Sequence, residues 1–479
     1  MQKLVCFTLG LVLFEACAST PQQNIDPPNI VVIICDDLGY ADVGFNGSTD
    51  ITTPAIDELA TGGTVFSSAY VAHPFCGPSR AGLLTGRYPH SFGSQFNIPA
   101  NSEDQGYGIP LSEKFLSEEL QEAGYYTGIV GKWHLGANAQ FHPNERGFND
   151  FYGFLGGGHD YFPEKYQAAY KRQKEAGVKK IFDYLKPLER NGVDQRETEY
   201  ITDALSREAA RFVADASKKD KPFFLYLAYN APHSPLQAKE EDLAKFSHIQ
   251  DKKRKTYAAM VYAVDRGVQR LVDQLKASGE YENTLIVFLS DNGGKLKLGA
   301  NNYPLKRGKG STSEGGYRVP MFFHWPNQVK SGVTYSHPVS ALDFYPTFVH
   351  LAQSTIAKDE PLDGKNIWEG ITTNTSARPG EMIYVMRHWP GYSDVGARMD
   401  DWKILKQDEE PWKLYNVQTD LSENIDLTAG NKERLKTMVE RAELWSQTHA
   451  EPLWFDPESL REDWSEKEMA EFHGVFEID

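Results

Sequence analysis

Three runs of consecutive apolar residues constrain the fold of this chain more than any other feature. They cover residues 29–35, 223–229 and 284–290 and are rich in β-branched and aromatic side chains. A run without polar interruption is typical of a strand covered on both faces, as in the parallel sheet of an α/β protein. The chain has 479 residues, enough to bury such a sheet beneath helices on each side.

Helical patterns separate the three runs. Apolar side chains recur every three or four residues in 201–212 and 257–275, which marks one face of a helix in each segment. A similar pattern at 116–120 ends at Gly124, a typical helix stop, and a short strand is predicted at 127–130. This alternation predicts an α/β fold with a large mixed, mostly parallel sheet sandwiched by helices.

The pattern changes after about residue 375. Short strand-like runs at 382–386, 402–405 and 412–415 are separated by turns, and an amphipathic helix is predicted at 431–448. These segments predict a smaller C-terminal antiparallel sheet plus one helix. The predicted domains are therefore an α/β domain at 27–375 and an α+β subdomain with an acidic tail at 376–479.

The N-terminal residues have the pattern of an export signal. Lys3 gives a positive start, residues 4–14 form an apolar run, and small residues surround Cys17. The run is too short to span a bilayer but fits a secretory signal peptide at 1–19. We therefore expect an exported protein, periplasmic or secreted, with lipid attachment at Cys17 as the weaker alternative. No other stretch of the sequence is apolar enough to cross a membrane.

Charge and cysteine content argue against two classes of protein. The 50 basic and 66 acidic residues give a net charge of −16, whereas broad nucleic-acid binding needs a basic face. A small cationic pocket can still bind an anionic substrate. Beyond the predicted signal only Cys35 and Cys76 remain, so the chain is not a disulfide scaffold. A single disulfide could join them, but we favour Cys35 as a buried strand residue.

Polar residues follow two of the predicted strands directly. Asp36 and Asp37 come after the first strand, and Asp291 and Asn292 come after the strand at 284–290. Ligands of open α/β sheets bind at the carboxyl ends of strands, so these side chains are expected to converge. Three carboxylates and an amide oxygen suit Ca²⁺ or Mg²⁺, which would also offset their mutual repulsion. The alternative is that they are ordinary turn and helix-capping residues.

Cys76 lies in an unusual segment, His73-Pro-Phe-Cys-Gly-Pro-Ser-Arg-Ala-Gly-Leu-Leu-Thr-Gly-Arg87. A thiol at the start of a helix can be activated as a nucleophile, although composition alone favours a plain buried cysteine. The segment resembles the sulfatase signature Cys-x-Pro-Ser-Arg followed by Leu-Thr-Gly. On this motif the chain resembles the type I, formylglycine-dependent sulfatases of the alkaline-phosphatase-like superfamily.

The resemblance covers about residues 30–450 and implies a cofactor and a modification. Asp36, Asp37, Asp291 and Asn292 match the metal ligands of the family, with the modified Cys76 as a further ligand. One Ca²⁺ ion is expected, with Mg²⁺ as the alternative. The resemblance also implies that a separate formylglycine-generating enzyme oxidises Cys76 to formylglycine.

Further blocks of the family supply the expected catalytic groups. Lys132 and His134 lie in Gly-Lys-Trp-His-Leu-Gly, and His233 lies in Ala-Pro-His. Lys309 lies in Gly-Lys-Gly, and Arg80 belongs to the cysteine motif. Each residue alone has an ordinary interpretation, such as a core histidine or a solvated lysine, but the blocks occur in family order.

The resemblance implies a reaction in two steps. One hydroxyl of the hydrated aldehyde attacks sulfur, while Ca²⁺, Arg80, Lys132 and Lys309 offset the charge on the sulfate oxygens. His233 or Lys309 gives a proton to the leaving sugar oxygen. The second hydroxyl is then deprotonated with the help of His134, and sulfate leaves as the aldehyde re-forms.

The expected substrate is a sulfated polysaccharide or oligosaccharide. Two other functions stay open, a phosphate or phosphonate monoester hydrolase of the same superfamily and a non-catalytic glycan-binding protein. A packed core edge is an equally good interpretation of the residues that we select for sugar contact. These residues are His159, Arg387, His388 and Trp389.

Overall fold

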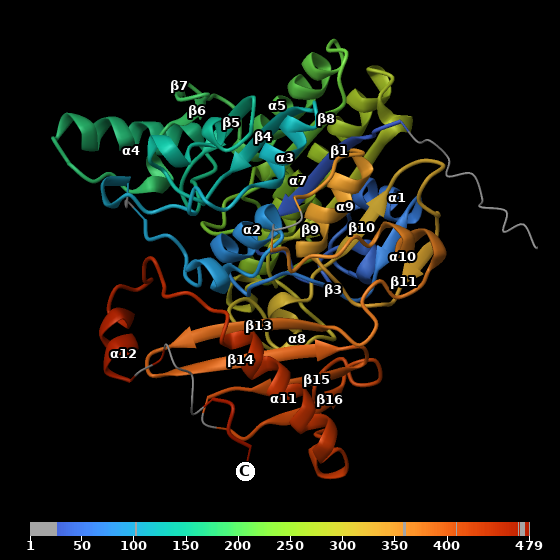
Figure 1. Cartoon of the computed structure of the whole chain (residues 1–479). Helices are drawn as coiled ribbons and strands as arrows, with labels where there is room; N and C mark the ends of the chain where they lie inside the picture. The colour runs from blue at the N-terminus through green and yellow to red at the C-terminus, as the bar shows by residue number, and fades with distance from the viewer. Residues whose placement is uncertain are drawn as a thin grey trace, which may run out of the picture.

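The three apolar runs form neighbouring strands in the middle of a ten-stranded sheet (Figure 1). The computed structural model describes residues 26–100, 103–357, 361–408, 410–467, 469 and 475–478, so the predicted signal peptide lies outside the described residues. The strand order is β11-β2-β10-β9-β1-β8-β4-β5-β6-β7. The strands are β1 (Asn29–Cys35), β2 (Thr64–Phe66), β4 (Tyr126–Lys132), β5 (Asp150–Phe154), β6 (Leu188–Arg190), β7 (Val193–Gln195), β8 (Phe223–Ala228), β9 (Thr284–Ser290), β10 (Met321–His324) and β11 (Val333–Tyr335).

The five central strands, β9, β1, β8, β4 and β5, run parallel. Their register aligns Cys35 with Ser290 and Ile34 with Ala228, so the carboxyl ends of β1, β8 and β9 lie side by side. Antiparallel pairing joins β10 to β9 and β2, and joins β6 to β5 and β7. The predicted mixed, mostly parallel sheet is confirmed.

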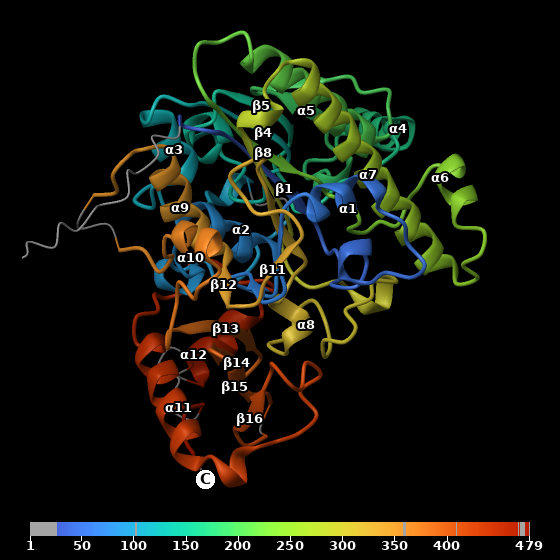
Figure 2. The ribbon, with the colours of Figure 1, turned by 90° about the vertical axis from the view of Figure 1, so that its right-hand side faces the viewer.

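Alternate side chains of β1 enter two separate apolar clusters. Ile30, Val32 and Ile34 pack with one set of helices, α2, α3 and α9, whereas Val31 and Ile33 pack with α1, α5 and α7 on the opposite face (Figure 2). This two-sided burial explains why the strand sequence has no polar alternation. The helices of this part are α1 (Pro54–Thr61), α2 (Cys76–Thr85), α3 (Leu116–Glu122), α4 (Pro163–Glu175), α5 (Ile201–Ala216), α6 (Glu240–Lys245), α7 (Lys252–Ala277), α8 (Glu314–Tyr317), α9 (Phe344–Leu351) and α10 (Trp368–Thr373).

A separate four-stranded antiparallel sheet follows, in the order β13-β14-β15-β16. The helix α11 (Lys432–Ser446) buries Leu435, Met438 and Val439 and packs against β14 and β15. The predicted small sheet and helix are confirmed. Because both sheets contribute to one apolar cluster, the domain boundary at 375 stays a prediction. The strands are β13 (Met382–Trp389), β14 (Tyr392–Met399), β15 (Trp402–Lys406) and β16 (Lys413–Asn416).

The C-terminal tail packs back onto the chain that follows α2. Trp454 is buried and donates a hydrogen bond from Nε1 to the backbone oxygen of Phe96 at 2.8 Å. The short helix α12 (Leu460–Glu466) buries Trp464 beside Phe455. The tail therefore contributes to the region beside Cys76, which is about 380 residues away in sequence.

A buried network of charges connects the smaller sheet to the larger part of the molecule. Lys403 of β15 lies 3.1 Å from Glu314 of α8 and 2.8 Å from Glu423, and none of the three side chains is exposed. Arg318 adds a second cation, 2.9 Å from Glu314. Burial would raise the pKa of Glu314, but Lys403 and Arg318 outweigh it and lower that pKa to about 2.

Two smaller expectations concern cysteine and membrane topology. Cys35 and Cys76 are both free thiols, so the disulfide considered for them is absent and Cys35 is a buried strand residue. Among the residues described, no helix has the length and apolar character needed to cross a membrane.

A short two-stranded sheet pairs β3 (Ala69–Tyr70) with β12 (Val339–Ser340).

Candidate active site

The carboxyl ends of β1 and β9 bring four polar side chains together. The backbone N–H of Asp37 donates to Asp291 Oδ1 at 3.3 Å, and the Asn292 amide donates to Asp37 Oδ1 at 2.8 Å. Asp36, Asp37, Asp291 and Asn292 are all buried. The convergence predicted from the two strand ends is therefore present in the structure.

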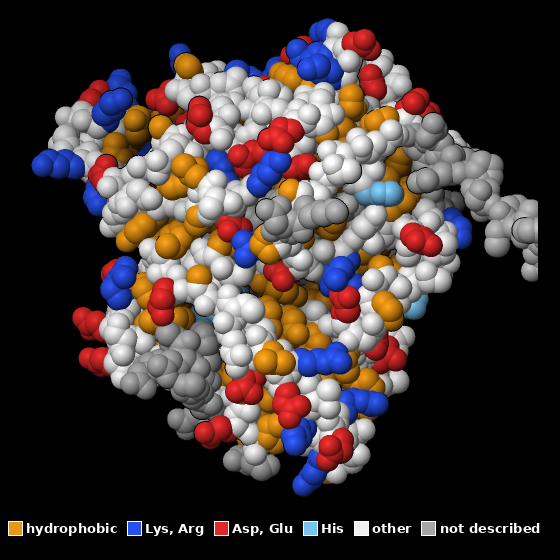
Figure 3. All heavy atoms as spheres, in the orientation of Figure 1, with side chains coloured by type: hydrophobic (Ala, Val, Ile, Leu, Met, Phe, Trp, Pro, Cys, Tyr) orange, Lys and Arg blue, Asp and Glu red, His pale blue; other side chains and the backbone are white. Residues whose placement is uncertain are grey.

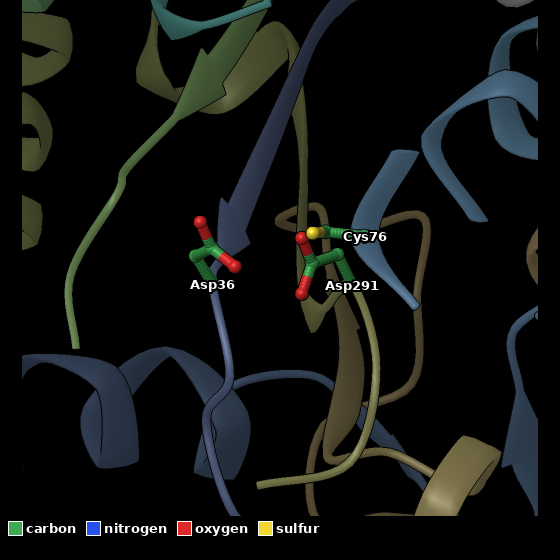
Figure 4. A group of neighbouring side chains, drawn as sticks. All are labelled: Asp36, Cys76 and Asp291. Carbon is green, nitrogen blue, oxygen red and sulfur yellow. The ribbon is translucent and has the colours of Figure 1, made fainter. Parts of the chain in front are cut away.

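Cys76 reaches the same place from the first residue of α2 (Figure 4). The Cys76 sulfur and carboxylate oxygens of Asp36 and Asp291 all lie within 4.8 Å of one another. Asn97 fixes the start of the helix, because its Oδ1 accepts a hydrogen bond from the Gly77 N–H at 3.0 Å and lies 3.8 Å from the Cys76 sulfur. Asn97 was not predicted from the sequence, because it lies in no recognisable motif.

Arg80 pairs with one of the carboxylates. Its Nε donates to Asp291 Oδ2 at 2.9 Å, and its NH1 donates to the backbone oxygen of Lys132 at 3.2 Å. Neither the guanidinium nor the carboxylate is exposed. The sequence separates the two residues by 211 positions, and the fold closes that distance because α2 covers the end of β9.

Two lysines supply the other positive charges. Lys132 Nζ lies 2.7 Å from Asp36 Oδ2, with both side chains fully buried. Lys309 Nζ lies 2.5 Å from Asp37 Oδ1 and 3.8 Å from the Cys76 sulfur, and only 8% of its side chain is exposed. Each carboxylate of the site is thus paired with its own cation.

Gly131 allows β4 to bring Lys132 this close. Its φ is +116°, and a Cβ at this position would lie 1.9 Å from the backbone oxygen of Ala228 on β8. Only glycine fits both the backbone conformation and the space. The glycine before Lys132 therefore has a structural role in the site.

The carboxylates differ in their electrostatic environment. Burial and then the nearby Asp36 carboxylate together raise the pKa of Asp291 to about 6, against the opposing positive charge of Arg80. Burial also acts to raise the pKa of Asp37, but Lys309 and then His233 outweigh it and hold this pKa well below its usual range. The negative charge of Asp37 is consequently better stabilised than that of Asp291.

The two histidines of the site are held neutral. Burial, followed by the positive charges of Lys132 and Arg80, lowers the pKa of His134 well below its ordinary value. Burial lowers the pKa of His233 to about 3. His233 Nδ1 lies 2.7 Å from the backbone oxygen of Ser234, which can only accept, so Nδ1 carries the proton and the Nε2 lone pair faces Asp37 Oδ2 at 3.9 Å.

Three oxygen atoms at the strand ends fit a metal ion. Asp36 Oδ1, Asp37 Oδ2 and Asn292 Oδ1 are buried without a hydrogen-bond partner among the described residues. Leaving such atoms unpaired is costly, and an oxygen-rich set with nearby carboxylates is the donor set that Ca²⁺ and Mg²⁺ prefer. The residues present therefore fit a hard divalent cation.

A pocket of about 340 Å³ opens beside Cys76 and has walls from distant segments. Arg387 lies 3.3 Å above the ring of Trp389 and hydrogen-bonds the backbone oxygen of Gly310 in the Lys309 loop. His388 also lines this pocket, and its Nδ1 lies 2.8 Å from Ser393 Oγ. Other lining residues include His73, Phe75, Asn97, Asp456 and Pro457.

His159 lies apart from this pocket. It is fully buried, and its two ring nitrogens lie 2.6 Å from the backbone oxygen of Asp160 and 2.8 Å from that of Lys186. Both nitrogens are thus occupied by the protein, and neither is left for a sugar in this arrangement. Of the four selected residues, Arg387, His388 and Trp389 share one pocket.

Comparisons with known proteins identify the family. Residues 28–354 match the Sulfatase family, and residues 309–447 match the C-terminal family of N-sulphoglucosamine sulphohydrolase. The chain is 31% identical to arylsulfatase J of Mus musculus over 481 residues, covering 91% of this chain and 78% of the relative. It is 34% identical to N-acetylgalactosamine-6-sulfatase of Mus musculus over 378 residues, covering 76% and 68% respectively.

A solved structure is more similar still. The crystal structure of Ps i-CgsB in complex with k-i-k-neocarrahexaose superposes with a TM-score of 0.93 at 57% sequence identity, covering 94% of this chain and all of that chain. Fold and site together define a hydrolase of sulfuric esters. The chain belongs to the sulfatase family.

Proposed function

We propose that this sulfatase removes sulfate from a carrageenan-type oligosaccharide or polysaccharide, with residue 76 in the formylglycine form. The meeting of Cys76, Lys309 and the Asp36–Asp291 pair at one point supports this proposal most strongly. The carbohydrate class is supported by the k-i-k-neocarrahexaose bound to the relative that is 57% identical. A formylglycine-generating enzyme is the maturation partner that this proposal requires.

The modified residue supplies a hydrated aldehyde, of which one hydroxyl attacks sulfur and the other allows the aldehyde to re-form. The chain contributes orientation. Asn97 holds the N–H of Gly77, and Arg80 of the same helix is bonded to Asp291, so residue 76 is fixed relative to the end of β9. A nucleophile held in one geometry reacts faster because its orientation is settled before the reaction begins.

Positive groups around residue 76 would bind the sulfate. Lys132 and Lys309 are buried ammonium groups, and such groups stabilise charge strongly where water is excluded. Asp36, Asp37, Asp291 and Asn292, with residue 76, would hold Ca²⁺, which supplies further positive charge to the sulfate oxygens. Arg80 keeps Asp291 oriented from behind.

Two groups are candidates for giving the leaving sugar oxygen its proton. Burial acts to lower the pKa of Lys309, but the Asp37 carboxylate opposes it and keeps this pKa above its ordinary value, so the ammonium keeps its proton. His233 has a lowered pKa and presents a lone pair at Nε2. This contrast favours Lys309 as the donor. The neutral His134 suits the opposite task, accepting a proton from the second hydroxyl.

The sugar that carries the sulfate would lie in the pocket beside Cys76. Arg387, which is stacked on the Trp389 ring, and Asp456 offer polar groups of opposite charge. His388 would contribute to the shape of the pocket because its ring is buried. We assign His159 to packing rather than to sugar contact, since its ring nitrogens lie on backbone oxygens.

We also propose export, with a cleaved signal peptide at 1–19, because Lys3 is followed by an apolar run and then by small residues. A polysaccharide substrate would be encountered outside the cytoplasm, in the periplasm or the surrounding medium.

Acidic and basic side chains are mixed on the face shown in Figure 3, so this face offers no broad cationic surface for nucleic acid.

Sulfate release tests the proposed function. The protein would be co-expressed with a formylglycine-generating enzyme and offered k-i-k-neocarrahexaose, other sulfated glycans, an aryl sulfate and the matching aryl phosphate. We expect sulfate from the neocarrahexaose and a higher kcat/KM on the aryl sulfate than on the aryl phosphate. Hydrolysis of the aryl phosphate alone would favour the phosphoester alternative, and tight glycan binding without turnover would favour a binding protein.

A further inference from the structure

A second pocket, with a volume of about 360 Å³, also has Trp389 in its wall. Trp389 therefore lines both this pocket and the one beside Cys76. The loop that carries Lys309 into the active site also contributes Lys306 and Arg307 to the second pocket. The two pockets are therefore adjacent and share parts of their walls.

Trp389 and Tyr392 form an aromatic pair at the tip of the β13–β14 hairpin. Their ring centroids lie 6.0 Å apart with an angle of 17° between the planes. The indole is fixed by a hydrogen bond from Nε1 to Asp394 Oδ2 at 2.9 Å and by Arg387 on its face. Both rings are half-buried. A rigid, partly exposed aromatic surface binds an amphipathic ligand at a low cost in conformational entropy.

Most charged groups of this second pocket are paired within the protein. Lys306 Nζ donates to the backbone oxygen of Glu423 at 2.8 Å, and Lys413 Nζ lies 3.2 Å from Glu410. Asp394 accepts from Trp389 and also from the backbone N–H of Asp408. These groups maintain the shape of the pocket.

Two charged side chains of the second pocket have no partner among the described residues. Arg307 is exposed, and its guanidinium makes no hydrogen bond or ion pair with the described part of the chain. The carboxylate of Asp408 is likewise exposed and has no partner among those residues. A guanidinium suits a sulfate group, which presents several acceptor oxygens, and a carboxylate suits hydroxyl donors. Beside an aromatic surface, this pair matches a sugar that carries both sulfate and hydroxyl groups.

We propose that the second pocket is a subsite for another sulfated sugar of the same substrate chain, and this inference rests on the proposed function. The substrate would cross Trp389, with the sugar that loses sulfate on the Cys76 side and a second sulfated sugar on the Arg307 side. The enzyme would then prefer an oligosaccharide to a single sulfated sugar unit, because only the longer ligand occupies both pockets.

Substitutions at Arg307 and Tyr392 test this subsite. We expect Arg307→Ala to lower kcat/KM on k-i-k-neocarrahexaose about tenfold, chiefly through KM, as a lost charge-assisted contact would. Hydrolysis of an aryl sulfate, which cannot reach the second pocket, should be unchanged. Tyr392→Ala should act in the same selective way, whereas Tyr392→Phe should keep the stacked ring and the activity. Arg172→Ala, on exposed α4, is the matched control for loss of a surface charge.

Two results would overturn the subsite, and a third would overturn the proposed substrate instead. Unchanged hexasaccharide kinetics in Arg307→Ala and Tyr392→Ala would overturn it. An equal loss on hexasaccharide and aryl sulfate would also overturn it, because the loop would then act through Lys309. Should the wild-type enzyme release no sulfate from any glycan, the proposed substrate fails. The dissociation constant of k-i-k-neocarrahexaose for Cys76→Ala, with and without Arg307→Ala, then tests the subsite separately: weaker binding supports it, and equal binding overturns it.

Discussion

The ammonium of Lys132 lies 2.7 Å from Asp36 Oδ2, and neither side chain is exposed to solvent. Lys132 ends β4 and Asp36 follows β1, with only β8 between these strands in the sheet. The parallel register therefore delivers a buried positive charge to the point where the sulfate would lie. The same geometry means that loss of the lysine leaves Asp36 with one cation fewer.

Removal of that charge should be costly for catalysis. Lys132→Met keeps most of the side-chain length without the ammonium, and we expect kcat/KM on an aryl sulfate to fall about 100-fold or more. Lys330→Met, at an exposed position, is the control for loss of a lysine. Near-normal turnover by Lys132→Met would remove this residue from the sulfate site.

Metal removal should affect both stability and activity. Asp36, Asp37 and Asp291 are buried together, and Asp36 Oδ1 and Asp37 Oδ2 have no hydrogen-bond partner among the described residues, so a bound cation would stabilise the cluster. We expect chelation to lower the melting temperature and abolish turnover, with Ca²⁺ restoring both better than Mg²⁺. A ligand at about 100 times its Kd contributes about 2.7 kcal/mol of stability. Asp291→Asn should need more Ca²⁺ for the same shift, and a melting temperature insensitive to chelation would contradict the metal site.

The buried network around Lys403 should carry much of the connection between the two sheets. Lys403→Met leaves Glu314 and Glu423 without their shared cation, so we expect a loss of about 3–5 kcal/mol in the free energy of unfolding. Denaturant unfolding measures this loss. The exposed Lys436→Met on α11 should change stability by less than about 0.5 kcal/mol. Equal effects of the two substitutions would refute the role of the network.

Stability should also depend on pH through Asp265, which is remote from the active site. Its Oδ1 accepts a hydrogen bond from the N–H of Ile56 at 2.9 Å, and burial raises the pKa of this carboxyl to about 7. A carboxyl with a raised pKa in the folded state contributes stability at low pH that is lost as pH rises toward 7. Asp265→Asn keeps the acceptor without the charge.

We therefore expect Asp265→Asn to be more stable than the wild type above pH 7, while the two proteins converge near pH 4. Thermal unfolding across this range measures the difference, with a slope on the order of 1 kcal/mol per pH unit. An identical pH dependence for both proteins would show that Asp265 keeps its charge in the folded state.

Sequence patterns predicted the strands that are buried on both faces and the helices with one regular apolar face. The runs at 29–35 and 284–290 coincide with β1 and β9, and the helix expected at 431–448 corresponds to α11. The strand β14 was not predicted, because Ser393, Asp394 and Arg398 make it polar. Their partners, which include His388 and Tyr70, come from other segments and cannot be inferred from spacing.

The site also contains some residues that could be predicted from the sequence and others that could not. The paired residues after β1 and β9 were predictable, because the ends of parallel strands meet at one edge of a sheet. Asn97 and the pocket wall from Asp456 were not, since tertiary packing brings Asn97 to Cys76 and brings Asp456 to the pocket that Asn97 also lines. The burial of His159 could not be predicted either, because the contacts of its ring nitrogens with backbone oxygens depend on the folded chain.

We propose that residue 76, as formylglycine, carries out sulfate ester hydrolysis. Preparations with different degrees of conversion, each measured by the mass of the peptide containing residue 76, would be assayed for sulfate released from k-i-k-neocarrahexaose and from an aryl sulfate. We predict that the turnover rate rises in proportion to the converted fraction, and that Cys76→Ala and Cys76→Ser fold normally but release no sulfate. Turnover that is independent of conversion, or that is retained in either variant, would contradict this role of residue 76.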